Sequence, residues 1–263
     1  MDSIKYEGIM EEQGGGHGRI QRCRVEPGNI SCISKPVDHF EAEAYHSLQN
    51  TPLKNYIPKF YGIHKSGSQD NIIMEDLTLG FKSPCMGDFK VGTRHYDINS
   101  SETQINTRIE RQKGSTTETI GVRITDVKTR KNGSVVKSWD RTHGFSFTYD
   151  QFEDAWNEFL PTAHIREEVL RQLNDIYSAF EKTLKEHPGF RIYSSSIFIA
   201  YDGDDLSDKC DVRVRFIDLA HAHLDLRREG CDIEDEKYDD GVLQGLSSLM
   251  NFQFKDIPQS GVN

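Results

Sequence analysis

Apolar residues along the first eighty positions alternate over short runs and once recur at helical spacing. Residues 19–25 and 30–35 alternate weakly around a Pro-Gly-Asn turn, which is typical of a β-hairpin. Residues 39–48 place their apolar side chains on one helical stripe, and 71–77 form a short apolar strand that ends in acids. This part of the chain therefore predicts a small antiparallel sheet with one helix packed against it.

The rest of the chain mixes strand and helix patterns without an internal repeat. We predict, in chain order, a polar helix over 101–113, strands over 119–127 and 133–139, helices over 148–160 and 169–184, strands over 190–203 and 211–222, and a last helix over 241–253. Thr148 and Gln151 form a capping-box pattern, and His187-Pro188-Gly189 ends the long helix. The order predicts an α+β protein of two lobes.

The cysteines and the apolar runs bear on where the protein works. Five cysteines are scattered through the chain without a C-x-x-C pair: Cys23, Cys32, Cys85, Cys210 and Cys231. This favours reduced thiols over a zinc site or a disulfide framework. The first residues are polar and acidic, unlike a signal peptide, and no apolar run approaches the roughly 18 residues of a membrane span. We expect a monomeric cytoplasmic or nuclear protein without a membrane span.

The charge is unevenly distributed. The net charge is -10, yet residues 89–141 hold eleven Lys and Arg against six Asp and Glu, which is +5 locally and leaves -15 elsewhere. One basic region in an acidic protein suits a compact polyanion better than a nucleic acid, which the remaining surface would repel. The chain also lacks the strand motif of RNA-binding modules, in which aromatic and basic residues alternate. An ordinary solvated basic face would give the same count.

Two short stretches could carry chemistry. In "SPCMGDFKVGTRHYD" (83–97), Asp88 and Lys90 are two residues apart and so point to the same side of a strand. Stability alone rarely explains such a pair in a buried strand. In "RFIDLAHA" (215–222), Asp218 ends an apolar strand, where an acid either caps a turn or holds magnesium near nucleotide phosphates. Together the two stretches favour a nucleotide and metal site.

These stretches carry a family resemblance. P-x-x-x-D-x-K-x-G at 84–92, followed by a serine run and by Ile-Asp-Leu-Ala-His at 217–221, resembles the inositol polyphosphate kinase family. Further stretches agree in order: "QGGGHGR" (13–19), "SKPVDHFEAEAY" (34–45), "MEDLTLGFKSPC" (74–85), "YSSSIFIAYDG" (193–203) and "GLSSLM" (245–250). Two departures, Ser-Ile-Phe at 196–198 for Ser-Leu-Leu and Ile-Asp-Leu for Ile-Asp-Phe, change packing rather than charge.

The resemblance covers nearly the whole chain and implies a two-lobed, kinase-like fold. The N-lobe would comprise residues 1–78, an antiparallel sheet plus a helix that serve the nucleotide phosphates. The C-lobe would comprise residues 79–263, with an inserted helical segment at about 98–118 that binds the inositol phosphate. ATP and Mg²⁺ are the implied cofactors.

The resemblance also implies the residues that bind the nucleotide and metal. They are Lys35, Glu41, Glu75, Leu77, Asp88 and Asp218 for ATP, with Asp218 and Ser196 for the metal. Lys35, held by Glu41, would reach the α- and β-phosphates. The backbone of Glu75 and Leu77 would read the adenine edge, and Asp88 would accept hydrogen bonds from the ribose hydroxyls.

The implied catalytic residues are Lys90, between the γ-phosphate and the acceptor, and Asp218. The acceptor would be bound by Lys90, Arg94, Arg108, Arg111, Lys113 and His221, with Arg123 and Arg213 as further candidates. Arg108 and Arg111 lie three apart on the polar helix and can line one surface.

The stretches "GTRHYD", "TIGVRI" and "RIYSSSIFIAYDG" look most like the inositol hexakisphosphate kinases. The implied activity is ATP-dependent conversion of inositol hexakisphosphate to a diphosphoinositol pentakisphosphate. A multikinase that phosphorylates hydroxyls of less phosphorylated inositols is the alternative, and a non-catalytic inositol phosphate sensor is a third reading. No residue stands out as a catalytic base. A substrate phosphate is already ionised at neutral pH, whereas a hydroxyl needs tighter orientation, and the residues leave the nucleophile and the ring position open.

Overall fold

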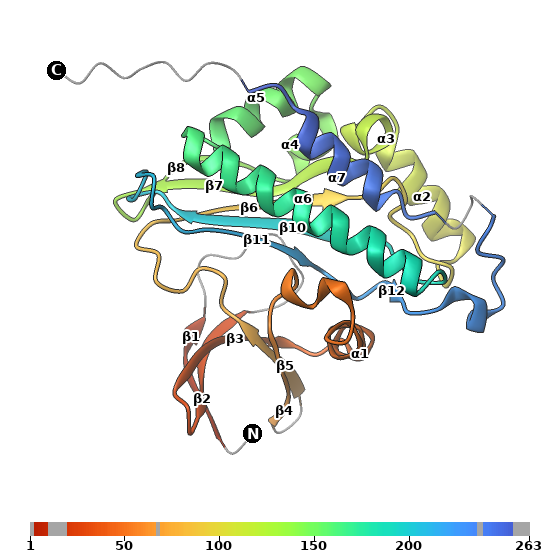
Figure 1. Ribbon diagram of the computed structural model, residues 1–263, viewed down its shortest axis with the longest axis horizontal. Helices are drawn as coiled ribbons and strands as arrows, with labels where there is room; N and C mark the ends of the chain where they lie inside the picture. Colours follow the sequence, from red (N-terminus) through yellow and green to blue (C-terminus); the bar gives the residue numbers. More distant parts are fainter. Residues whose placement is uncertain (1–2, 10–19, 67–68, 236–238, 255–263) are drawn as a thin grey trace.

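The computed structural model describes residues 3–9, 20–66, 69–235 and 239–254 (Figure 1). The glycine-containing stretch at 13–19 lies outside these residues. Two antiparallel sheets form the framework, and the predicted boundary at residue 78 falls in the turn that joins them. Among the described residues, no helix is long and apolar enough to cross a membrane.

The N-terminal sheet has the strand order β1-β2-β3-β5-β4. Its strands are β1 (Ser3–Ile9), β2 (Gln21–Glu26), β3 (Ile30–Pro36), β4 (Phe60–Ser66) and β5 (Gln69–Glu75). Helix α1 (His39–Leu48) follows β3, and its N-cap Asp38 accepts hydrogen bonds from the backbone N–H groups of Phe40 and Glu41. The 3-10 turn η1 (Pro52–Asn55) then leads into β4.

The C-terminal sheet has the order β11-β10-β6-β7-β8. Its strands are β6 (Pro84–Val91), β7 (Val122–Lys131), β8 (Ser134–Trp139), β10 (Ser196–Asp202) and β11 (Val212–Ile217), and β9 (Arg191–Ile192) pairs separately with β12 (Ala222–His223). The helices are α2 (Glu102–Gln112), α3 (Thr116–Ile120), α4 (Arg141–Ser146), α5 (Tyr149–Phe159), α6 (Ala163–Glu186) and α7 (Val242–Asn251), with the 3-10 turn η2 (Leu226–Glu229). Helices α4 to α7 cover one face of this sheet, and the N-terminal lobe lies on the other side (Figure 1).

Strand β6 separates the two faces of the C-terminal sheet. Phe89 points into the helical layer, where its ring packs 5.0 Å from that of Trp156 and 5.7 Å from that of Phe159, centroid to centroid. Because side chains alternate along a strand, Asp88 and Lys90 point the other way, toward the N-terminal lobe. The apolar part of that second face is a small cluster of Leu77, Met86, Phe198 and Ala200, with Phe81 and Ile217 packed against it.

Most predicted elements form close to their predicted bounds. The helix predicted over 39–48 is α1, and the capping box of Thr148 and Gln151 begins α5. Two predictions were wrong in detail. The strand predicted over 119–127 starts instead with helix α3, which ends at Gly121 in the left-handed region at φ +69. The strand predicted over 190–203 is broken after Ile192, and Ser194 there has φ +57.

The outer edge of the C-terminal sheet is covered by helix α6. The Gln172 amide donates to the Val212 carbonyl at 2.7 Å and accepts from the Val214 N–H at 3.1 Å. One side chain thus satisfies two backbone groups of the edge strand β11, which would otherwise be free to pair with another chain.

We predict that Gln172→Ala lowers the free energy of unfolding by about 1–3 kcal/mol, because it removes two hydrogen bonds to the backbone. Urea denaturation followed by circular dichroism measures the change. Asn174→Ala, an exposed position on the same helix, should change stability by less than about 0.5 kcal/mol. Equal effects of the two variants would contradict a protective role for Gln172.

Candidate functional site

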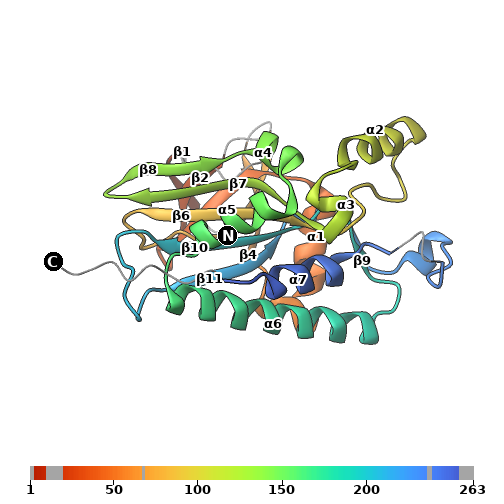
Figure 2. The same ribbon diagram turned by 90° about the horizontal axis from the view of Figure 1, so that it is seen from above.

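Strand pairing brings the acids and the lysine of the two sequence motifs together. Ser196 at the start of β10 pairs with Lys90 on β6 and with Ile217 on β11. Asp218 follows Ile217 directly, so Asp88, Lys90, Ser196 and Asp218 meet at one end of the sheet. Figure 2 shows that α2 and α3 lie at this end, while α6 runs along the edge marked by β11.

Asp88 is buried without a hydrogen-bond partner. Its side chain is 1% exposed, and among the described residues neither carboxylate oxygen is paired. The Ser196 hydroxyl, also unpaired, faces it without hydrogen-bond geometry. Burial and the negative charge of Asp218 raise the pKa of Asp88 to about 7, against the opposing effect of Lys90. Such a carboxylate is set to accept hydrogen bonds from a ligand.

Lys90 is held between these acids and a main-chain carbonyl. Its ammonium donates to the Ser194 carbonyl oxygen at 2.6 Å. Burial lowers the pKa of Lys90, while the carboxylates of Asp218 and Asp88 raise it. The lysine is therefore held by a main-chain carbonyl, and its charge interacts with both carboxylates.

Asp218 stands where the two lobes meet. Its backbone is in the left-handed region at φ +62, which costs a residue other than glycine about 1 kcal/mol or more. Its charge raises the pKa of Glu41 on helix α1, after the larger effect of burial. Helix α1 accordingly lies beside β12, just beyond Asp218 (Figure 1).

The chemistry of these donors fits a hard divalent cation only in part. The Asp218 carboxylate and the Ser196 hydroxyl are oxygen ligands of the kind that Mg²⁺ prefers. Within the described residues, however, no cluster of three or more His, Cys, Asp or Glu side chains could hold a metal alone. A metal at Asp218 would take its other ligands from phosphate oxygens and water, as magnesium does in nucleotide sites.

The N-terminal lobe contributes the predicted ion pair. Lys35 at the end of β3 contacts Glu41 on α1, with Nζ 2.7 Å from Oε1. Glu41 is nearly buried, and desolvation raises its pKa while Lys35 lowers it. The predicted contact between Lys35 and Glu41 is therefore present, and the role of Lys35 in binding the nucleotide phosphates remains a prediction.

Arg213, a candidate acceptor-binding residue, contacts the segment between the lobes instead. Glu75 ends β5, and Leu77 joins the apolar cluster on the second face of the C-terminal sheet. Arg213 donates to the Leu77 carbonyl at 3.1 Å and pairs with Asp211 at 2.6 Å. Five residues of extended strand separate Arg213 from Asp218, roughly 17 Å. The interpretation of Arg213 as an acceptor-binding residue was wrong, because it faces the hinge.

The loop before α2 and the serine run form a wall beside Lys90. The His95 carbonyl accepts from the Arg108 guanidinium at 2.7 Å and from the Ser194 hydroxyl at 3.0 Å. Arg94 donates to the Tyr96 carbonyl at 2.9 Å, and its guanidinium lies between the rings of Tyr96 and Tyr193. Arg94 and Arg108 are thus fixed in place next to the Ser194 carbonyl that holds Lys90.

The other basic residues of α2 are more loosely held. Helix α2 begins with a capping box of Ser101 and Gln104. Arg111 and Lys113 near its end are exposed, and Lys113 pairs with Glu110 at 2.6 Å. Solvent screens such pairs, so Lys113 remains available to an anionic ligand.

Arg123 is the most buried cation near the site. It pairs across the strands with Lys90, is 3% exposed, and its Nε has no partner among the described residues. Burial and the nearby charge of Arg141 lower the pKa of Arg123 to about 10. Both guanidinium groups lie over the Phe145 ring, at 4.4 and 5.5 Å from its centroid. Sequence reasoning found Arg123 but missed Arg141, whose place depends on the short helix α4.

His221 forms a pair that sequence reasoning also missed. Its Nδ1 lies 2.7 Å from Oδ2 of Asp97, a residue 124 positions away. The hydrogen bond to His221 lowers the pKa of Asp97 to about 2, against the effect of burial. The only sequence signal for this pair was that Asp97 ends the "GTRHYD" stretch (92–97), which belongs to the family resemblance.

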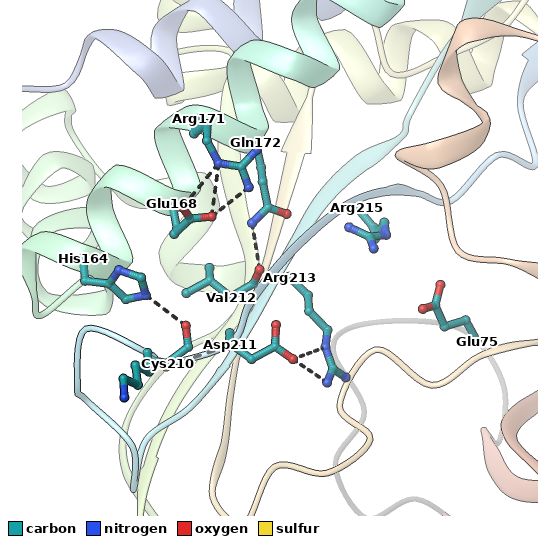
Figure 3. Close-up of a pocket in the computed structure, with 11 residues that line it drawn as sticks. Glu75, His164, Glu168, Arg171, Gln172, Cys210, Asp211, Val212, Arg213 and Arg215 are labelled. Atoms are coloured by element: carbon teal, nitrogen blue, oxygen red, sulfur yellow. Dashed lines mark hydrogen bonds and ion pairs between the residues drawn. The ribbon is translucent and has the colours of Figure 1, made fainter.

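A groove in the described part of the chain lies away from these residues. It has a volume of about 390 Å³ and is formed by α6, the start of β11 and Glu75 (Figure 3). Its lining is Glu75, His164, Glu168, Arg171, Gln172, Lys209, Cys210, Asp211, Val212, Arg213 and Arg215. None of Asp88, Lys90 or Asp218 lines it, so we assign the chemistry to the motif residues rather than to this groove.

Comparisons with known proteins agree with the motifs. The family model described as inositol polyphosphate kinase matches residues 71–253, more than two thirds of the chain. Human inositol hexakisphosphate kinase 2 is 27% identical over 223 residues, which are 72% of this chain and 52% of that protein. Mouse inositol hexakisphosphate kinase 3 is 27% identical over 208 residues, 72% of this chain and 51% of that one. The chain thus spans about half the length of these relatives.

Two solved structures share the fold. The inositol phosphate multikinase Ipk2 of S. cerevisiae, in complex with ADP and Mn²⁺, aligns with a TM-score of 0.67 at 22% identity, over 84% of this chain and 97% of its own. A second inositol phosphate multikinase structure aligns with a TM-score of 0.62 at 23% identity, over 81% and 97%. These likenesses confirm the predicted kinase-like α+β fold.

We predict that Asp88→Asn stabilises the ligand-free protein at pH 8 by up to about 4 kcal/mol, since the pKa of Asp88 is raised by roughly three units at about 1.4 kcal/mol each. Between about pH 4 and 7 the unfolded chain has lost this proton and the folded chain keeps it, so the wild-type stability falls as pH rises. Urea titrations at pH 4 and pH 8 measure this. An equal difference between the two proteins at both pH values would contradict the burial argument.

Proposed function

Because the chain belongs to the inositol polyphosphate kinase family, we propose that it transfers the γ-phosphoryl group of ATP to an inositol polyphosphate. The acceptor we propose is inositol hexakisphosphate, which would become a diphosphoinositol pentakisphosphate. The observation that carries this proposal is the buried, unpartnered Asp88 beside Lys90 and Asp218, in the order of the family's motifs. The named hexakisphosphate kinase relatives support the choice of acceptor.

On the donor side, the apolar cluster around Leu77 and Met86 offers adenine a flat contact next to the hinge. Asp88 would accept the ribose hydroxyls, which would fill its two unpartnered oxygens. Lys35, positioned by Glu41, would meet the α- and β-phosphates. Asp218 and Ser196 are the residues that would hold Mg²⁺, and a bound Mg²⁺ would neutralise phosphate charge. The ADP and Mn²⁺ in the yeast multikinase structure support this choice of cofactors.

On the acceptor side, the basic wall supplies the charge that a polyphosphate needs. Lys90, Arg94, Arg108, Arg111, Lys113 and His221 are the proposed contacts, with Arg123 and Arg141 behind Lys90. The buried guanidinium of Arg123 lacks a carboxylate partner among the described residues, which favours an anionic ligand nearby. A hexakisphosphate brings nucleophiles that are already ionised, so positioning and charge neutralisation suffice for transfer.

A multikinase activity on free inositol hydroxyls is the second candidate. It is favoured by the two multikinase structures that share the fold and by the His221–Asp97 pair, which offers a proton acceptor. A non-catalytic sensor would bind inositol phosphates without consuming ATP.

The purified chain should therefore be incubated with ATP, Mg²⁺ and a panel of inositol phosphates. We expect a product from inositol hexakisphosphate with seven phosphates on six carbons, identified by mass spectrometry and ³¹P NMR. Products from less phosphorylated inositols alone would replace the hexakisphosphate assignment by the multikinase one. Binding of inositol phosphates without any ATP consumption would refute kinase activity.

We predict that Asp218→Asn lowers kcat at least 100-fold, because it removes the charge that would hold the metal; this is about 2.7 kcal/mol of transition-state stabilisation. Asparagine adopts the left-handed backbone readily, so the fold should persist. Steady-state kinetics and a thermal melt measure the two effects. Asp208→Asn, an exposed position in the β10–β11 turn, is the matched control and should retain full activity. Retained activity of Asp218→Asn would overturn its proposed role.

A further inference from the structure

The pair formed by Asp97 and His221 has the geometry of an oriented proton acceptor. Oδ1 of Asp97 accepts from the Asn99 N–H at 2.9 Å and from the Ser100 hydroxyl at 3.2 Å. Oδ2 of Asp97 lies 2.7 Å from Nδ1 of His221 and forms the hydrogen bond between the two side chains. Since an ionised carboxylate only accepts hydrogen bonds, the proton of the neutral imidazole lies on Nδ1. The lone pair on Nε2 is then available.

The exposure of the two side chains fits this role. Asp97 is 12% exposed and His221 is 40% exposed, so the acid is enclosed and the ring remains accessible. Other histidine–carboxylate pairs in the described residues differ. His223 contacts Glu229 at 2.8 Å, but its Nε2 is buried without a partner. His143 contacts Asp140 within the exposed cap of α4, away from this wall.

The pair lies in the wall that also holds Lys90. The His221 carbonyl accepts from the Tyr193 N–H at 3.1 Å, and the next residue, Ser194, holds the Lys90 ammonium through its own carbonyl. Asp97 lies two residues beyond His95, whose carbonyl accepts from Arg108. His221 also follows Asp218 by three residues. An acceptor held by Lys90 and Arg108 would therefore meet the imidazole.

We propose that Asp97 is a positioning residue that orients His221 as the proton acceptor for an inositol hydroxyl, giving this site a second class of acceptor besides phosphate. The inference rests on the proposed kinase function. It goes beyond it by assigning the base for hydroxyl acceptors, for which the sequence offered no candidate.

The step balances as follows for an acceptor with a free hydroxyl. The hydroxyl oxygen forms a bond to the γ-phosphorus of ATP while the bond from that phosphorus to the β–γ bridging oxygen breaks, and ADP leaves with the electron pair. The hydroxyl proton passes to Nε2 of His221, and solvent later removes it. Asp97 stays ionised throughout and stabilises the imidazolium through the hydrogen bond to Nδ1.

A phosphate acceptor makes no use of this base. Its attacking oxygen is already ionised near neutral pH, because the second pKa of a phosphate monoester is about 6. The two acceptor classes should therefore respond differently when the base is disturbed. This difference separates a chemical role for the pair from a structural one.

The test compares Asp97→Asn with the wild type on two acceptors. Asparagine can still accept from Asn99 and Ser100, but its amide donates to Nδ1 and moves the imidazole proton to Nε2, where it blocks proton acceptance. With an inositol trisphosphate that has three free hydroxyls, kcat should fall about 100-fold or more, with KM within threefold. With inositol hexakisphosphate, kcat should change less than about threefold.

His221→Gln should likewise lower kcat on the trisphosphate about 100-fold, which keeps the test valid if Asp97→Asn proves unstable in a thermal melt. On the hexakisphosphate, where His221 is only a binding contact, this variant should raise KM and change kcat less than about threefold. Glu229→Gln breaks the neighbouring histidine pair and is the matched control, expected to leave both activities unchanged. A proportional loss on both acceptors, or a wild type that phosphorylates hexakisphosphate but no hydroxyl, overturns the inference and leaves the proposed kinase function standing. A wild type inactive on every acceptor overturns the kinase function itself.

Discussion

A carboxylate buried without donors is the constraint around which this molecule is arranged. Asp88 stands in β6, the middle strand of the C-terminal sheet, where desolvation and the charge of Asp218 oppose its ionisation. The same strand places Phe89 on the opposite face against the rings of α5. That aromatic core stabilises the strand and so offsets the unfavourable charge on the adjacent residue, about 3.3 Å away along the strand.

The acids that surround the site come from separate parts of the fold. Glu41 belongs to α1, Asp88 to β6, and Asp218 to the end of β11, and the charge of Asp218 raises the pKa of the other two. Lys35 and Lys90 offset this repulsion only in part. A divalent cation or a ligand with hydroxyl donors would relieve it, and it would do so by drawing on both lobes at once.

Local patterns in the sequence were sufficient where the governing interactions are local. The i and i+2 spacing of Asp88 and Lys90 predicted a shared side, and the capping residues Thr148 and Gln151 predicted the start of α5. The Lys35–Glu41 pair, which the family resemblance implied, also joins residues only six positions apart. The family motifs then indicated that β6 and the Asp218 segment belong to one site.

Interactions across the chain were beyond such patterns. Residues 116–120 form helix α3 instead of the start of the predicted strand, and Gly121 ends this helix. Gly121 lies so close to Gly245 that an added Cβ would come within 3.2 Å of the Gly245 nitrogen. Arg213 carried the same charge as the acceptor candidates, and only the strand's direction shows that it faces the hinge. The Asp97–His221 contact joins positions 124 residues apart and has no spacing signature.

In the proposed mechanism, two tasks of phosphoryl transfer fall to different residues. The cations Lys90, Arg108 and Arg123 serve charge neutralisation, which every acceptor requires. Proton removal would fall to the Asp97–His221 pair, and only a hydroxyl acceptor needs it. Because the two tasks use different residues, a change at one would shift the preference between acceptors without abolishing transfer. Acceptor choice in this fold can then vary through the loop that carries Asp97, while the charged strands stay as they are.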